Sequence, residues 1–201
     1  MQTEWEATFW PIDKSEMRKR LKDAGAVMVY PERLMRRVNL YPPDEEYALR
    51  AWVRVRDEGG KITLSLKERT GDNSRIDQMG EIELTVDDFE KTRDLLRGLG
   101  CKDKNYQETK RELWQLDDVD ITIDEWPFLE PFVEVEGTSE ESVKAASTKL
   151  GFAWEKARFD TADKVYAERY GVDYQFVNRH IPILTFDVPN PFEPLPGKDS
   201  E

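Results

Sequence analysis

The chain has 201 residues, of which 36% are charged and 38% hydrophobic, and its formal net charge is −12. This length suits one domain, or one domain with an extension, and the acidic balance argues against nucleic-acid binding because a phosphate backbone would be repelled. The single cysteine excludes an intrachain disulfide. With no long apolar run and no signal-peptide pattern, the composition predicts a cytoplasmic protein that does not enter a membrane.

Four helices are predicted, and each ends at a glycine. Apolar residues recur at helical spacing in each segment, and Asp13 with Glu16 has the form of a capping box. A glycine after the last turn is the usual helix stop. The predicted helices cover residues 13–24, 87–99, 139–150 and about 161–170, with N-terminal caps expected at Asp13, Asp87 and near Thr138 and Ser139, where Glu141 would be the box partner of Thr138.

Most of the remaining chain alternates polar and apolar residues, which predicts strands. Two pairs of strands are separated by short turns, Glu58-Gly59-Gly60 and Asp117-Asp118, so antiparallel hairpins are expected. The predicted strands cover residues 51–56, 61–67, 111–116, 119–125 and 132–136. About eight strands with one charged and one apolar face favour an α+β fold, in which an antiparallel sheet closes into a barrel and the helices pack outside.

Three Glu-x-Glu pairs, Glu4-x-Glu6, Glu81-x-Glu83 and Glu134-x-Glu136, each precede one of these helices. Residues i and i+2 of a strand share a face, so each pair directs two carboxylates to one side of the sheet. For a single strand, a solvated outer face explains this pattern. Over six strands that mix acids with Arg and Lys, a charged interior is favoured. Carboxylates there would bind Mg²⁺ or Mn²⁺, and the basic side chains would bind phosphate oxygens.

These residues resemble those of the CYTH family, the triphosphate tunnel metalloenzymes, which include class IV adenylyl cyclases and thiamine triphosphatases. The resemblance rests on the order of Glu4-x-Glu6, Arg54-x-Arg56, Leu64-x-Leu66-Lys67 and Phe132–Glu136, and it covers about residues 2–171. It implies a closed eight-stranded antiparallel barrel, open at both ends, that forms a triphosphate tunnel.

The resemblance also implies a role for individual residues. The implied metal ligands are Glu4, Glu6, Asp124, Glu134 and Glu136, the implied phosphate-binding residues are Arg54, Arg56, Lys67 and Arg111, and the implied catalytic acids are Glu81 and Glu83. Two positions depart from the family pattern, because Thr8 and Thr109 stand where lysines are usual. Lys110 has the wrong strand parity to replace Thr109.

The function expected from the sequence is metal-dependent hydrolysis of an inorganic, nucleoside or thiamine triphosphate. Two alternatives stay open: a class IV adenylyl cyclase that makes cyclic AMP and pyrophosphate, and a non-catalytic nucleotide- or polyphosphate-binding module. Residues 1–174 are expected to form the tunnel domain of a monomer or homodimer, and residues 175–201 a proline-rich, extended C-terminal segment. We expect Trp52 and Trp126 to be packing residues.

Overall fold

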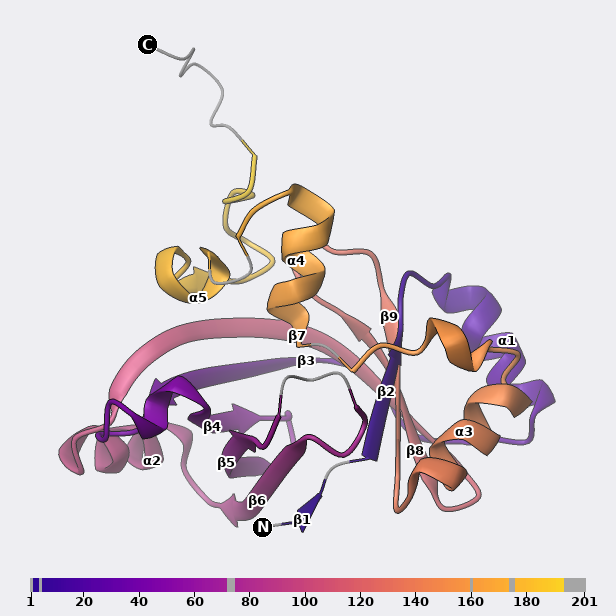
Figure 1. Cartoon of the computed structure of the whole chain (residues 1–201), viewed down its shortest axis with the longest axis horizontal. Helices are drawn as coiled ribbons and strands as arrows, with labels where there is room; N and C mark the ends of the chain where they lie inside the picture. Colours follow the sequence, from indigo (N-terminus) through magenta and orange to yellow (C-terminus); the bar gives the residue numbers. More distant parts are fainter. Residues whose placement is uncertain (1, 4, 72–74, 160, 174–175, 194–201) are drawn as a thin grey trace.

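A computed structural model of the chain describes residues 2–3, 5–71, 75–159, 161–173 and 176–193 (Figure 1). Glu4, one of the predicted metal ligands, lies outside these ranges. The strands are β1 (Gln2–Thr3), β2 (Trp5–Phe9), β3 (Val27–Tyr41), β4 (Ala51–Asp57), β5 (Ile62–Arg69), β6 (Met79–Val86), β7 (Lys102–Leu116), β8 (Val119–Glu125), β9 (Phe132–Gly137) and β10 (Ile183–Leu184). The α-helices are α1 (Lys14–Asp23), α2 (Phe89–Gly98), α3 (Glu140–Lys149), α4 (Ala162–Tyr170) and α5 (Phe176–His180).

The main strands form one curled, eight-stranded antiparallel sheet in the order β6-β5-β4-β3-β7-β8-β9-β2. At one edge β1 pairs with β6, and at the other edge β2 pairs with β9. Only Glu4 separates β1 from β2 in the sequence. The two edges of the curled sheet are therefore bordered by adjacent pieces of the N-terminal segment.

Both predicted hairpins are present. Strand β4 pairs with β5 so that Arg54 faces Ser65, and the turn between them places Gly59 at a φ of 79°. Strand β7 pairs with β8 so that Arg111 faces Asp124, and the turn holds Asp117 at a φ of 57°. The polar–apolar alternation therefore predicted the pairing of these strands correctly.

Strand β3 was not predicted, although it forms the middle of the sheet with β7 (Figure 1). Its first half lacks a clean alternation, and Pro31 interrupts it. Its second half does alternate, because Val38 and Leu40 pack under α2 while Arg37 and Asn39 face the other side. This missed strand carries residues of the candidate site.

The helices begin and end close to the predicted positions, but two caps differ. Asp13 accepts a hydrogen bond from the backbone N–H of Glu16, as expected. Helix α2 is capped by Asp88 and not by Asp87, and α3 is capped by Ser139 with Ser142 as its box partner. Leu99, the last residue of the predicted second helix, is exposed.

The apolar core lies on the outer side of the sheet, between strands and helices. Helices α1 and α3 cover β2, β8 and β9, and α2 covers β3 and β4. Met17, Leu21, Val143 and Leu150 supply the buried helix residues of the first region. Because the helices cover the apolar faces, the charged faces of the same strands point to the concave side of the sheet. Within the described residues, no helix is long and apolar enough to cross a membrane.

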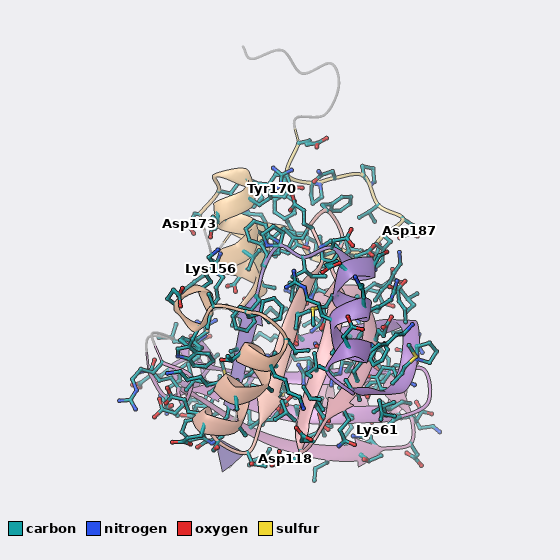
Figure 2. The ribbon with its side chains drawn as sticks, turned by 90° about the vertical axis from the view of Figure 1, so that its right-hand side faces the viewer. Lys61, Asp118, Lys156, Tyr170, Asp173 and Asp187 are labelled. Carbon is teal, nitrogen blue, oxygen red and sulfur yellow. The ribbon has the colours of Figure 1, made fainter. Side chains whose placement is uncertain are left out.

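The C-terminal segment is folded where the structure describes it, which corrects the expectation that it is merely extended. It forms helix α5 and the short strand β10, which pairs in parallel with β7. Ile181 and Leu184 are buried with Tyr166 of α4 in a third apolar cluster. Figure 2 shows Tyr170 and Asp187 at one end of the molecule, away from Lys61 and Asp118 at the hairpin turns.

Candidate functional site

The concave side of the sheet encloses a cavity of about 840 Å³. Its wall carries charged side chains from all eight main strands, together with α4 and one nearby loop. The lining cations are Arg37, Arg54, Arg56, Lys67, Arg69, Arg75, Lys104 and Arg111, and the lining carboxylates are Glu6, Glu81, Glu83, Asp120, Glu134, Glu136 and Asp163. Nine of the predicted site residues therefore line one cavity.

The remaining two predicted residues have different positions. Asp124 is completely buried behind the wall and is absent from the cavity lining. Glu4 lies outside the described residues. The residues predicted from the sequence lie on β2, β4, β5, β6, β7 and β9. The curled sheet gathers these strands around one cavity.

Arg111 lies between two carboxylates. Its Nε donates to Asp124 at 2.7 Å, and its Nη2 donates to Glu134 at 2.5 Å. Thr122 also donates to Asp124 from its hydroxyl. Burial alone would lower the pKa of Arg111, but the adjacent Asp124 and Glu134 outweigh it and raise that pKa well above its ordinary value. Arg111 is therefore a fixed cation in this wall.

The predicted catalytic acids are ion-paired in this structure. Glu81 lies 3.1 Å from Arg54 and 3.5 Å from Lys67, measured between the charged atoms. Glu83 lies 3.1 Å from Lys61 and accepts a hydrogen bond from Ser65 at 3.2 Å. Two predicted phosphate-binding cations are thus held by a predicted catalytic acid.

Acidic side chains from three adjacent strands form a row in the wall. The register places Glu136 of β9 directly opposite Glu6 of β2 on one side and Asp120 of β8 on the other. The side chain of Glu136 is exposed to solvent in the cavity, although protein atoms crowd around its carboxylate. Its pKa is raised first by this burial and further by Glu134 and Glu81, although Lys67 and Arg111 oppose the shift.

This row has the donor chemistry of a hard-cation site. Carboxylate oxygens are the ligands that Mg²⁺ and Mn²⁺ prefer, and crowding of like charges disfavours ionised Glu136 until a cation neutralises it. Among the described residues, however, no three Asp, Glu, His or Cys side chains converge closely enough to hold a metal. The residues therefore fit a divalent cation by chemical type, with Glu134 turned toward Arg111.

Sequence reasoning missed Arg37, which lies on the unpredicted strand β3. Its guanidinium stacks 4.2 Å from the ring centroid of Trp126, and only 8% of the residue is exposed. Burial lowers the pKa of Arg37 well below its ordinary value, and the neighbouring Arg54 and Arg56 lower it further. The alternation of Arg37 and Asn39 with Val38 and Leu40 is the signal that would have identified this strand.

Trp52 and Trp126 were expected to be packing residues; Trp126 does pack against the third apolar cluster, and both rings also line the cavity. The indole Nε1 of Trp126 is buried and has no hydrogen-bond partner among the described residues. Arg69 and Lys104 both lie near the ring of Trp52, at 5.6 Å and 5.9 Å from its centroid. Two aromatic rings therefore form part of the polar wall.

The threonines at the two departing positions are both buried. Thr8 lies opposite Glu134 in the β2–β9 register and makes a backbone bridge to Arg158. Thr109 is 2% exposed. Lys110 contacts Glu125 and the ring of Phe186 and is absent from the cavity lining, so it does not replace Thr109.

The sequence model of the CYTH domain matches residues 31–166, which is more than half of the chain. The chain belongs to the CYTH family. The resemblance seen in the sequence is thereby confirmed, and the match contains every predicted site residue except Glu4 and Glu6.

Solved structures share this CYTH fold along most of their length. A conserved hypothetical protein from Pyrococcus furiosus is 22% identical, with a TM-score of 0.65 over 79% of this chain and 97% of that one. A candidate adenylate cyclase from Vibrio parahaemolyticus is 10% identical, with a TM-score of 0.69 over 83% and 98% of the two chains. A candidate adenylyl cyclase from Hippeastrum, described as having a dominant triphosphatase activity, is 15% identical, with a TM-score of 0.53 over 84% and 96%. No protein with a curated function matches the chain.

Proposed function

We propose that this CYTH protein is a metal-dependent phosphohydrolase that cleaves a triphosphate inside its cavity. The observation that carries the proposal is the cavity of about 840 Å³, whose wall places basic side chains beside a row of carboxylates. A triphosphate can leave water for a partly enclosed site only where opposite charges replace its hydration. The Hippeastrum protein with triphosphatase activity gives further support, because it shares the fold.

The sheet is proposed to close into the barrel that the sequence predicted. Support comes from the N-terminal segment, because β1 pairs with β6 and β2 pairs with β9. If Glu4 continues the strand between them, its carboxylate shares a face with Glu6. The acidic row would then extend from Asp120 to the β6 side of the tunnel.

The phosphate chain is proposed to lie against Arg54, Arg56, Lys67 and Arg111, joined by Arg37. Guanidinium groups bind phosphate oxygens through paired N–H donors, and their bonds to anions are stronger than neutral hydrogen bonds. Arg54 and Lys67 now contact Glu81. We expect both side chains to turn toward the phosphates when a ligand enters.

The divalent cation is proposed to be held by Glu6, Glu134 and Glu136 with Glu4, and by Asp124 if Arg111 moves to the phosphate. A bound Mg²⁺ or Mn²⁺ would neutralise phosphate charge and polarise water. The chain's own residues supply the remaining steps. Glu81 or Glu83, once freed from its basic partners, would orient a water molecule toward the terminal phosphorus and accept its proton.

The reaction forms a bond between the water oxygen and the terminal phosphorus. The bond from that phosphorus to the bridging oxygen breaks, and tripolyphosphate then yields phosphate and pyrophosphate. The former bridging oxygen leaves with pyrophosphate and carries a new negative charge. The basic side chains stabilise this charge. The role of the protein is to position these groups and to complement their charge.

A class IV adenylyl cyclase is the second candidate, because Trp52 and Trp126 could contact a nucleotide base in the same cavity. The cavity volume lies within the range of sites that hold organic ligands of this size. In this reaction the ribose 3′-hydroxyl attacks the α-phosphorus and pyrophosphate leaves. The acids and basic residues are the same in both reactions.

A substrate panel separates these functions. Tripolyphosphate, ATP and thiamine triphosphate are each incubated with the protein and Mg²⁺ or Mn²⁺, and phosphate, pyrophosphate and cyclic AMP are measured. Phosphate release supports the hydrolase, whereas cyclic AMP and pyrophosphate from ATP alone would assign the cyclase. Binding of all three ligands without any product would leave the non-catalytic binding module.

A further inference from the structure

Lys104 is directed into the cavity by an irregularity in the central strand pair. Asn39 pairs with Asn105, but the next residue, Leu40, pairs with Asp103. Lys104 is therefore the extra residue of a β-bulge on β7. Bulges re-aim side chains and are common beside binding sites, and here the re-aimed side chain lines the cavity.

The surroundings of Lys104 hold its ammonium without an ion pair. Its Nζ lies 5.5 Å from the ring centroid of Tyr41 and 5.9 Å from that of Trp52. Among the described residues, no carboxylate lies within ion-pair distance of Lys104. Asp163 at the start of α4 attracts it from further away, and Arg69 repels it.

Arg69 lies near the same ring and, like Lys104, has no ion-pair partner among the described residues. Its guanidinium carbon lies 5.6 Å from the ring centroid of Trp52, and its buried Nε has no hydrogen-bond partner among the described residues. Burial and Arg69 together lower the pKa of Lys104 to about 8. Two neighbouring cations in a cavity wall disfavour one another unless an anion lies between them.

The position of this pair extends the line of phosphate-binding cations. Arg69 follows Lys67 by two residues on β5, so the two side chains share a face and are separated by about 7 Å along the strand. Lys67 lies beside Glu81 and near Glu136, at the acidic row. Arg69 therefore continues the line of cations on this face of β5 by one position, and Lys104 lies near it across the ring of Trp52.

We propose that Arg69 and Lys104 form a second anion site that binds a further phosphate group of a polyphosphate chain whose first phosphates lie at Lys67, Arg54 and Arg111. This inference rests on the proposed function and names its substrate class. The preferred ligand is an inorganic chain of at least three phosphates. A cationic organic group such as thiamine would be repelled at this position.

The test compares chain lengths in one binding experiment. Calorimetry measures the affinity of the full-length protein for pyrophosphate, tripolyphosphate, tetrapolyphosphate and ATP, in buffers with and without Mg²⁺. The variant Lys104→Met keeps an apolar stem of similar length and removes the charge. We expect this variant to bind tripolyphosphate and tetrapolyphosphate about tenfold more weakly, because one charge-assisted contact is lost. Its affinity for pyrophosphate should change less than about twofold.

Two further variants make the result specific. Arg69→Met should show the same dependence on chain length, which guards against a folding defect in the first variant. Lys102→Met removes an ammonium from the same strand whose side chain is 75% exposed, and it should leave all affinities unchanged.

An equal loss of affinity for all four ligands, or no loss for any of them, would overturn the second anion site while the hydrolase proposal stands. If the variants bind ATP more weakly but bind tetrapolyphosphate as well as the unmodified protein does, the second anion site is also overturned, because the site would then bind an organic group. Failure of the unmodified protein to bind any of the ligands would overturn the proposed function together with this inference.

Discussion

Arg111 and Asp124 face each other across β7 and β8, and the guanidinium of one donates to the buried carboxylate of the other at 2.7 Å. Asp124 is fully buried, so its charge depends on this partner. The same guanidinium also contacts Glu134 of the next strand. One side chain therefore ties the proposed phosphate-binding cations to the proposed metal ligands.

Loss of this guanidinium should strongly destabilise the protein. Arg111→Met leaves Asp124 and Glu134 without their shared cation, and breaking a buried pair in this way costs about 3–5 kcal/mol. Urea unfolding measures the change. The double variant Arg111→Met with Asp124→Asn should recover part of the loss, because the stranded charge is removed.

Arg50→Met provides the matched control. Arg50 pairs with Glu68 at 2.8 Å, but its side chain is 52% exposed. Exposed pairs contribute about 0–1 kcal/mol, so the control should unfold at nearly the same urea concentration as the unmodified protein. A similar cost for both arginines would contradict the assigned role of Arg111.

The acidic row should be required for turnover and dispensable for folding. Glu6→Gln and Glu136→Gln keep the shape of each side chain and remove one metal-binding charge. We expect phosphate release from tripolyphosphate to fall at least a hundredfold while circular dichroism is unchanged. Glu90→Gln, at a side chain that is 62% exposed on α2, should retain full activity. Unchanged rates in both row variants would remove the metal assignment.

Arg37 should stabilise the ligand complex at the expense of the free protein. In the absence of ligand it is a buried cation that faces Arg54, Arg56 and Arg111. Arg37→Met should therefore raise the free energy of unfolding by about 1 kcal/mol and weaken tripolyphosphate binding about tenfold. Urea unfolding and calorimetry give the two readings.

The neighbouring Arg36 serves as the control for this prediction. It lies on the opposite face of β3, where it pairs with Asp57 at 3.1 Å, and its side chain is 45% exposed. Arg36→Met should leave tripolyphosphate affinity unchanged and should not increase stability. An increase in stability with no loss of affinity at Arg37 would show that this cation serves neither folding nor binding.

Asp103 should make stability depend on pH in the acidic range. Hydrogen bonds from Arg97 and then from Arg93 lower the pKa of Asp103 to about 2, against the effect of burial. The unfolded chain binds this proton at about pH 4, so the stabilisation is complete above that pH and is lost as the pH falls toward 2. Because about a third of the side chain is exposed, its size is on the order of 1 kcal/mol.

Asp103→Asn should therefore be less stable than the unmodified protein at pH 7, and the difference should shrink as the pH is lowered to 3. Urea unfolding at pH 7, 5, 4 and 3 measures it. Asp118→Asn, in the exposed β7–β8 turn, is the control and should show the pH dependence of the unmodified protein. A constant difference between Asp103→Asn and the unmodified protein at every pH would contradict the ion-pair explanation.

The elements that the sequence predicted best are those whose signal is local. Val55 and Arg56, or Ile121 and Asp120, differ in polarity because neighbouring strand residues face opposite sides. Helix ends at Gly25 and Gly151 follow from the left-handed backbone that both residues adopt. Such features need no knowledge of the remaining chain.

Elements without a regular local pattern were missed. Strand β3 begins with exposed Val27 and Val29 and contains Pro31, so its pairing with β7 comes from tertiary contacts. Helix α5 lies in a segment whose prolines predicted extended structure, and it is held by packing against α4.

By itself the sequence determined which side chains share the charged face of each strand, because that depends only on strand parity. Only the tertiary structure decided which of them meet. Pairing of β2 with β9 places Glu6 beside Glu136, and the register of β7 with β8 places Arg111 opposite Asp124. Strand β3, which was not predicted, adds Arg37 to the same cavity. The bulge that points Lys104 into the cavity is likewise a property of register between two strands, which neither strand encodes alone.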